Sequence, residues 1–144
     1  MKKVMFVGAS GSGKTTLYQR LEACHMDYDK TQVIEFHKNV IDTPGEYLEN
    51  RGYYSALHVT SVEADVVALV MDCKSRRNVF PPGFARMFTK QIIGIVTKTD
   101  LILEGETDDY AEDSLKQTGV CEIFKISSLK NQNIEELRKF LEWN

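Results

Sequence analysis

Short apolar runs alternate with amphipathic stretches along most of this 144-residue chain. The runs at 4–7, 64–71 and 91–96 are almost continuously apolar, and a weaker run spans 122–126. Continuous apolar runs of this length are typical of strands that are covered on both faces. The pattern therefore predicts buried strands at these positions, as in a mostly parallel sheet.

A different pattern occupies the region between the first two buried strands. Two shorter runs, at 33–36 and 39–42, are separated by a polar pair of residues. Short strand-like runs with a brief polar connection are typical of a hairpin. We therefore expect an antiparallel pair of strands here.

Apolar positions at helical spacing fill the gaps between the strand-like runs. The helices predicted from this spacing lie at 15–24, 53–63, 107–116 and 133–143, with a short helix at 84–88 after a loop. Thr107 is the expected N-cap of the helix at 107–116, and Gly119 is its expected stop. Strands that alternate with helices predict an α/β fold, a three-layer α/β/α sandwich whose ligands bind beyond the carboxyl ends of the strands.

Composition narrows the class of protein. The chain carries 18 basic and 21 acidic side chains, for a net charge of −3. A mildly acidic chain has no general attraction for nucleic acid or for an anionic membrane surface. No apolar run reaches the length of a membrane span, and the first strand follows the N-terminus directly. We expect a cytoplasmic protein without a signal peptide, folded as a single domain over residues 1–144.

The three cysteines indicate the redox environment. Cys24, Cys73 and Cys121 are far apart, odd in number and outside any C-x-x-C pair. Cys73 and Cys121 lie in or next to apolar strand-like runs, which predicts buried, reduced thiols. The three histidines share no metal-ligand spacing, so we assign them no site.

The strongest motif lies at residues 8–15, Gly-Ala-Ser-Gly-Ser-Gly-Lys-Thr, which matches G-x-x-x-x-G-K-[ST]. It follows a predicted strand and opens a predicted helix. In that context backbone N–H groups point inward at a phosphate, and the helix adds its positive dipole end. Lys14 is then expected to reach the β and γ phosphates, and the Thr15 hydroxyl to hold Mg²⁺. The alternative, a glycine-rich turn without a ligand, explains fewer of these features.

A second motif, Asp42-Thr43-Pro44-Gly45, follows the strand at 39–42. The Asp42 carboxylate is placed to hold a water on Mg²⁺, and the Gly45 N–H to contact a γ-phosphate. Taken alone, the segment also fits a Pro-Gly turn with an Asx cap. Its position at the same sheet edge as the first motif favours the phosphate site.

Two later segments resemble the elements with which GTPases read guanine. Residues 97–100, Thr-Lys-Thr-Asp, resemble the [NT]-K-x-D element, in which the carboxylate accepts two hydrogen bonds that adenine does not offer. The lysine stem lies along the base in that element. Residues 127–129, Ser-Ser-Leu, resemble the S-A-K element, whose backbone N–H meets the guanine carbonyl oxygen. A polar loop after a strand remains the alternative for both, more so for the shorter one.

In order and spacing, the whole set resembles the small-GTPase family over nearly the full chain. Residues 30–32, 42–47 and 97–100, on so compact a chain, are similar to the EutP/PduV group of ethanolamine and propanediol utilisation. The resemblance implies a Ras-like P-loop NTPase domain with one antiparallel edge strand, and Mg²⁺ with GTP or GDP as cofactors. It also implies a switch or assembly role in bacterial catabolic microcompartments, with shell or pathway proteins as partners. Thr31 would be the switch threonine that meets Mg²⁺ and the γ-phosphate.

These expectations define a set of site residues. The residues expected to contact the nucleotide are Gly8, Ser10, Gly11, Ser12, Gly13, Lys14, Thr15, Thr16, Gly45, Thr97, Lys98, Asp100, Ser127 and Ser128. The residues expected at the metal are Thr15, Thr31 and Asp42. The residues expected to act in catalysis are Lys14 and Thr31.

Three positions depart from the GTPase pattern. Glu46 stands where efficient GTPases often carry a glutamine, and a γ-phosphate repels its carboxylate, so we assign it no catalytic role. Thr97 in place of asparagine removes an amide that would tie the base to the P-loop, the phosphate-binding loop at residues 8–15. Leu129 in place of lysine removes a cation that stacks on the base. We therefore expect modest GTP affinity and slow hydrolysis.

Two other functions remain open. The first is a kinase that passes the γ-phosphoryl group of ATP to a small carboxylate such as acetate, because the same cradle stabilises transfer to any positioned nucleophile. Asp100, which has no role on adenine, and the lack of an evident acceptor-binding arginine pair stand against it. The second is a degenerate scaffold that binds nucleotide weakly or not at all. No arginine finger is assigned, although the chain offers Arg51, Arg76 and Arg77.

Overall fold

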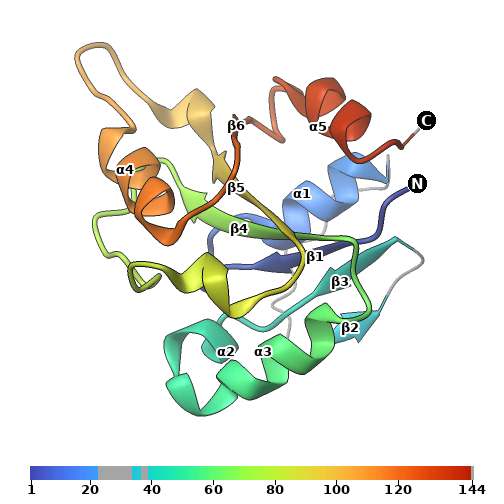
Figure 1. Ribbon diagram of the computed structural model, residues 1–144. Helices are drawn as coiled ribbons and strands as arrows, with labels where there is room; N and C mark the ends of the chain where they lie inside the picture. The colour runs from blue at the N-terminus through green and yellow to red at the C-terminus, as the bar shows by residue number, and fades with distance from the viewer. Residues whose placement is uncertain (23–33, 37–38, 144) are drawn as a thin grey trace.

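The computed structural model describes residues 1–22, 34–36 and 39–143. Within these residues a sheet of six strands runs through the molecule in the order β2-β3-β1-β4-β5-β6 (Figure 1). The strands are β1 (Val4–Val7), β2 (Glu35–Phe36), β3 (Val40–Asp42), β4 (Val66–Asp72), β5 (Gln91–Thr97) and β6 (Ile123–Lys125). All neighbouring pairs are parallel except β2 and β3. The predicted sheet, with one antiparallel edge strand, is confirmed.

Helices cover both faces of this sheet. The α-helices are α1 (Lys14–Leu21), α2 (Glu46–Glu49), α3 (Tyr54–Ser61), α4 (Asp109–Thr118) and α5 (Ile134–Phe140). Short 3₁₀ turns lie at η1 (Arg51–Tyr53), η2 (Phe84–Met87) and η3 (Thr99–Leu101). Figure 1 shows α1 and α5 on one side of the sheet and α3 on the other.

Alternating residues of each strand supply the two halves of the core. Val4 and Phe6 of β1 pack with Leu17 of α1 and Leu137 of α5. Met5 of β1 belongs to the opposite cluster, which contains residues of α2, α3 and α4. Because strand side chains alternate between faces, a strand buried on both sides must be apolar throughout. The predicted three-layer α/β/α sandwich is therefore confirmed.

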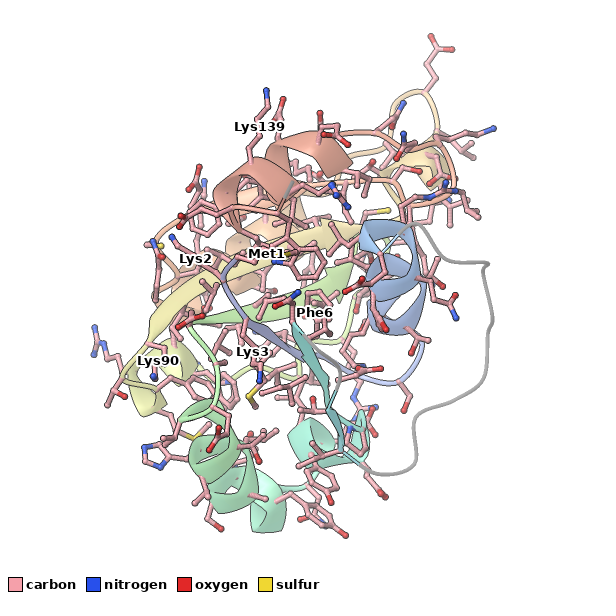
Figure 2. All side chains as sticks on the ribbon, turned by 90° about the vertical axis from the view of Figure 1, so that its right-hand side faces the viewer. Met1, Lys2, Lys3, Phe6, Lys90 and Lys139 are labelled. Carbon is pink, nitrogen blue, oxygen red and sulfur yellow. The ribbon has the colours of Figure 1, made fainter. Side chains whose placement is uncertain are left out.

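The segment that follows α5 is hydrogen-bonded to Lys2, just before β1. The Lys2 backbone N–H donates to the Leu141 carbonyl oxygen at 2.8 Å, and the Trp143 indole Nε1 donates to the Lys2 carbonyl oxygen, also at 2.8 Å. The Lys2 ammonium group, labelled in Figure 2, lies 5.2 Å from the centroid of the Phe140 ring. These contacts hold α5 against the face that it shares with α1.

Several boundaries differ from the sequence expectations. The helix predicted at 53–63 begins at Tyr54, and the separate helix α2, which precedes it, was not predicted. Asn50 divides the two, since its backbone is extended and its side chain accepts a hydrogen bond from the Gly52 N–H at 2.9 Å. Asp108, not Thr107, is the N-cap of α4, and Gly119 ends that helix with a φ of 100°, as predicted.

The described thiols are of two kinds. Cys73 is buried as predicted, and its Sγ donates to the Lys98 carbonyl oxygen at 3.0 Å. Cys121 is exposed, so the expectation of burial was wrong there: the residue precedes β6 in a loop at the molecular surface. Cys24 lies outside the described residues. None of the described helices has the length and apolar character that crossing a membrane requires.

Candidate nucleotide site

The loop between β1 and α1 has the backbone that the motif at 8–15 demands. Gly11 and Gly13 have φ values of 80° and 100°, in the left-handed region that favours glycine. A Cβ atom on Gly8 would lie 2.5 Å from the Val70 carbonyl oxygen, so only glycine lets the loop pass this close to β4. The glycines of the motif are thus explained by local geometry before any ligand is considered.

Lys14 is buried inside this loop. Its ammonium group donates to the carbonyl oxygens of Gly8 at 2.7 Å and Ala9 at 3.1 Å. Burial lowers the pKa of Lys14 to about 8, while the nearby carboxylates of Asp42 and Glu49 oppose that shift. A positive charge that is desolvated at a helix N-terminus is placed to gain from an arriving anion.

Thr15 and Asp42 come together from α1 and the end of β3. The Thr15 hydroxyl donates to the Asp42 carboxylate at 3.2 Å, and Asp42 is buried. This proximity follows from the parallel pairing of β1 with β3, which places the loops at their carboxyl ends side by side. A hydroxyl and a carboxylate side by side are the oxygen donors that Mg²⁺ prefers, so the residues fit that ion. Thr31, the third expected metal residue, lies outside the described residues.

Gly45 brings the second motif into direct contact with the P-loop. A Cβ atom on Gly45 would lie closer than 3.0 Å to the Ser10 backbone nitrogen, so the close approach needs glycine. One turn further along α2, the Glu49 carboxylate accepts a hydrogen bond from the Ser10 N–H at 3.3 Å. Glu46, at the start of α2, is exposed. The sequence analysis missed Glu49, whose only signal is its place one helical turn after Gly45.

Thr97 joins the loop after β5 to the P-loop. Its hydroxyl, buried at the end of β5, donates to the Ser12 carbonyl oxygen at 2.5 Å. This bond joins the two loops, whereas the expected loss of a tie between the base and the P-loop stays a prediction. The two segments meet because Gly13 has no side chain: a Cβ atom there would lie only 3.3 Å from the Thr97 hydroxyl oxygen.

Lys98 makes a second bond between the loop after β5 and the P-loop. Its ammonium group donates to the Gly11 carbonyl oxygen at 2.7 Å and pairs with the Asp72 carboxylate at 3.2 Å. Lys98 also has a φ of 61°, which turns the chain sharply at the end of β5. Asp72, at the end of β4, was not predicted, and its role is visible only once β4 and β5 lie side by side.

Asp100 is held by the segment after β6. The Ser127 hydroxyl donates to the Asp100 carboxylate at 2.6 Å and accepts from the Lys130 N–H at 3.1 Å. The Ser128 carbonyl oxygen accepts from the guanidinium Nε of Arg20 at 2.7 Å, which links this segment to α1. Arg20 is a further contact that the sequence analysis missed.

These segments surround a cavity of about 230 Å³. It is lined by Gly13, Thr16, Thr97, Lys98, Asp100, Leu101, Ser128 and Leu129. The structure thus brings together residues of three separate motifs. An apolar wall with one carboxylate at its edge suits a flat heterocycle that carries N–H donors.

Comparison with known proteins identifies relatives over almost the whole chain. The family model described as ethanolamine utilisation – propanediol utilisation (PduV-EutP) matches residues 1–143. The chain is 41% identical over 141 residues to the propanediol utilization protein PduV of Citrobacter freundii, covering 98% of this chain and 93% of that one. It is 34% identical over 145 residues to the probable acetate kinase EutP of Escherichia coli K12, covering 98% and 89%.

A solved structure is similar in fold. The bacterial selenocysteine-specific elongation factor EF-Sec matches with a TM-score of 0.69 and 23% identity, over 98% of this chain. This chain spans only 28% of the length of that protein. The likeness supports a GTPase-like α/β fold, as the arrangement of the strands also indicates. Together with the match over residues 1–143, the relatives that share its length show that the chain belongs to the PduV-EutP family of ethanolamine and propanediol utilisation.

Proposed function

We propose that this protein binds GTP and GDP with Mg²⁺ and hydrolyses GTP slowly. One observation carries the proposal: the loop after β5, which lines the cavity of about 230 Å³ (the base cavity), is hydrogen-bonded to the P-loop. The Thr97 hydroxyl and the Lys98 ammonium group donate to the P-loop carbonyl oxygens of Ser12 and Gly11. A base held by the loop after β5 therefore has its phosphates directed into the loop after β1.

The expected residues take the following roles in this proposal. Lys14 balances phosphate charge, and backbone N–H groups of the P-loop with Thr16 and Gly45 complete the cradle. Thr15 and Asp42, with Thr31, would hold Mg²⁺, and the ion would supply positive charge to neutralise the charge that develops during transfer. Lys14 and Thr31 are the groups that act on the γ-phosphate.

Asp100 selects the base. Its carboxylate accepts from the N1–H and exocyclic amine of guanine, while Ser127 fixes its orientation through the 2.6 Å hydrogen bond. Ser128 supplies a backbone contact at the rim of the cavity. Adenine lacks this pair of donors, so the carboxylate disfavours ATP.

Hydrolysis is expected to be slow because we assign no side chain, among residues 1–22, 34–36 and 39–143, to orient a water molecule. Glu46 occupies the position after the second motif and is exposed, and a carboxylate is repelled by the γ-phosphate. Phosphoryl transfer is accelerated mainly by positioning and by added positive charge, so a site without these groups turns over slowly.

The experiment is a titration of the full chain with fluorescent GDP, GTP and ATP in the presence and absence of Mg²⁺. We expect guanine nucleotides to bind at least about tenfold more tightly than ATP, because a polar site rejects a base that leaves its carboxylate unpaired. Asp100→Asn should shift this preference toward xanthosine nucleotides, and Asp109→Asn, in α4, is the matched control. Equal binding of all three nucleotides by the unmodified chain contradicts the proposal.

A second candidate is an ATP-dependent kinase for a small carboxylate such as acetate, because the EutP relatives are named probable acetate kinases. The observation that favours it is a cavity of about 390 Å³ that both Arg51 and Arg77 line, next to Glu49. In this candidate function, Arg51 and Arg77 would be the acceptor-binding arginine pair that the sequence analysis did not find. In this reaction an acetate oxygen bonds to the γ-phosphorus while the bond to the β–γ bridging oxygen breaks, and the nucleoside diphosphate leaves. Acetyl phosphate trapped as its hydroxamate, from ATP and acetate, distinguishes the two candidates.

Family membership supports a place in ethanolamine or propanediol catabolism. We assign the protein the role of a cytoplasmic switch or assembly factor, a single domain over 1–144, whose partners are microcompartment shell or pathway proteins. Sedimentation of the tagged chain with purified shells, with GTP or GDP present, tests this role. Pelleting that is equal with and without shells contradicts it.

A further inference from the structure

Two adjoining cavities share no lining residue with the cavity of about 230 Å³, and one of them lies against the P-loop. One, of about 260 Å³, is lined by P-loop residues 9–12 and by the chain at the end of β4 and after it, including Lys74 and Arg77. The other, of about 390 Å³, is lined by residues of α2, by Arg51 and by residues 77–82. Arg77 and Val79 line both cavities. The Ser10 N–H and the Glu49 carboxylate, which are hydrogen-bonded at 3.3 Å, belong one to each cavity.

Some of the charged side chains around these cavities form ion pairs and others do not. Lys74 is paired with Glu106 at 3.3 Å, and Asp72 with Lys98 at 3.2 Å. Within the part of the chain that the structure describes, no ion pair is formed by Arg77. Arg77, which lines both cavities and is exposed, therefore remains available to an anion.

A carboxylate group of the protein itself, that of Glu49, is already hydrogen-bonded to the P-loop next to these cavities. The Glu49 carboxylate accepts from the Ser10 N–H, and its charge reaches Lys14, whose pKa it tends to raise. Gly45 packs against the Ser10 backbone at the same point. A carboxylate that sits on a P-loop amide shows that this position tolerates and stabilises negative charge.

We propose that the outer face of the P-loop is a binding site for a small carboxylate anion, with the Ser10 N–H and the Arg77 guanidinium group as its donors. Glu49 is the internal occupant, which such a ligand displaces. A planar guanidinium group binds a carboxylate through two parallel hydrogen bonds, whereas Lys74 is a point charge that already has a partner. The site supplies the acceptor position for the second candidate function, and its test needs no nucleotide.

The test is an NMR titration of the ¹⁵N-labelled full chain with sodium acetate, against sodium chloride at equal ionic strength. We expect the Ser10 amide and the Arg77 Nε–H resonances to shift in a saturable way with acetate alone. Arg77→Ala should weaken acetate binding about tenfold, the effect of losing one charge-assisted bidentate partner. Arg76→Ala is the matched control, because Arg76 is a neighbouring exposed arginine that lines neither cavity.

Glu49 provides a second pair of variants with the opposite expectation. Glu49→Ala frees the Ser10 amide and should tighten acetate binding severalfold, while Glu46→Ala removes the same charge from the same helix and should leave it unchanged. These outcomes differ in sign from the loss at Arg77, so a general loss of folding cannot produce both.

Three results would overturn the site. Chemical shifts that grow linearly with acetate concentration mean that acetate has no specific site. Equally weakened acetate binding in Arg77→Ala and Arg76→Ala means the same. A parallel titration with sodium phosphate that moves the Lys14 and Thr15 amides, while acetate leaves Ser10 unmoved, means that the phosphate cradle alone takes anions. Failure of guanine nucleotides to bind would sink the proposed function but leave this result standing.

Discussion

At the scale of single residues, the site depends on a charged group and a hydroxyl that are buried. Lys14 is the clearest case, because burial lowers its pKa to about 8 even though two carboxylates oppose that shift. Thr97 is the second, because its buried hydroxyl bonds the P-loop. The desolvated charge of Lys14 would be stabilised by a bound phosphate, and the Thr97 bond would hold the P-loop in place for it.

Nucleotide affinity should fall as the pH rises above about 8. Free Lys14 loses its proton near that pH, whereas phosphate charge in the bound state favours the protonated form, so binding takes up a proton in this range. With one proton coupled, affinity decreases about tenfold per pH unit until the pKa of the complex is reached. Calorimetry of GDP binding in two buffers that differ in ionisation enthalpy measures the uptake. Lys14→Arg, which keeps its charge in this range, should lose the dependence, and an unchanged slope in that variant would contradict the assignment.

Thr97→Val should loosen the link between the base loop and the P-loop. The substitution keeps the shape of the side chain but leaves the Ser12 carbonyl oxygen without its hydroxyl donor, at a cost of about 1–3 kcal/mol in the free energy of unfolding. Chemical denaturation measures that loss, and GDP affinity should fall with it. Thr97→Ser retains the hydroxyl and is the matched control. Equal stability of the two variants would show that the 2.5 Å contact contributes nothing.

At the scale of elements, the sequence pattern predicted the strands and the longer helices and missed helix α2. The buried strands β1, β4 and β5 follow directly from continuous apolar runs, since both of their faces are covered. Helix α2 has only four residues, with Leu48 as its one buried side chain, so it gives no periodicity to detect. Likewise, the partners of Lys98 and Ser10 come from other strands and helices. Only the fold brings Asp72 and Glu49 to them.

Gly45→Ala should separate α2 from the P-loop. The added Cβ atom would lie closer than 3.0 Å to the Ser10 backbone nitrogen, and backbone on both sides leaves the clash no easy relief. We expect a loss of more than about 1 kcal/mol in the free energy of unfolding, as for other overpacked sites. Loss of the Glu49 hydrogen bond should appear as faster exchange of the Ser10 amide hydrogen. Gly52→Ala is the control, because its Cβ atom would meet only the Asn50 side chain, at 3.2 Å. Identical exchange in both variants would contradict this account.

At the scale of the whole molecule, the site residues are connected to the packing of α1 against α5. Arg20 of α1 bonds the Ser128 carbonyl oxygen beside the base cavity, and Arg138 of α5 bonds the Leu21 carbonyl oxygen at the end of α1. Trp143, beyond α5, is buried and bonds the Lys2 carbonyl oxygen ahead of β1. The C-terminal segment therefore stabilises the layer that carries both the P-loop helix and the base loop.

Trp143→Ala should weaken the fold without removing the site. Truncating a buried tryptophan costs about 3–5 kcal/mol, and the lost indole donor leaves the Lys2 carbonyl oxygen without that bond. Under the proposed function, a guanine nucleotide binds the native state alone. Mg²⁺ and GDP at about 100 times the dissociation constant should then restore about 2.7 kcal/mol of that stability. Thermal unfolding of Trp143→Ala with and without GDP measures both effects, and Trp143→Phe separates packing from the hydrogen bond. If the melting temperature of Trp143→Ala does not respond to GDP while the unmodified chain responds, the C-terminal segment also shapes the nucleotide site itself.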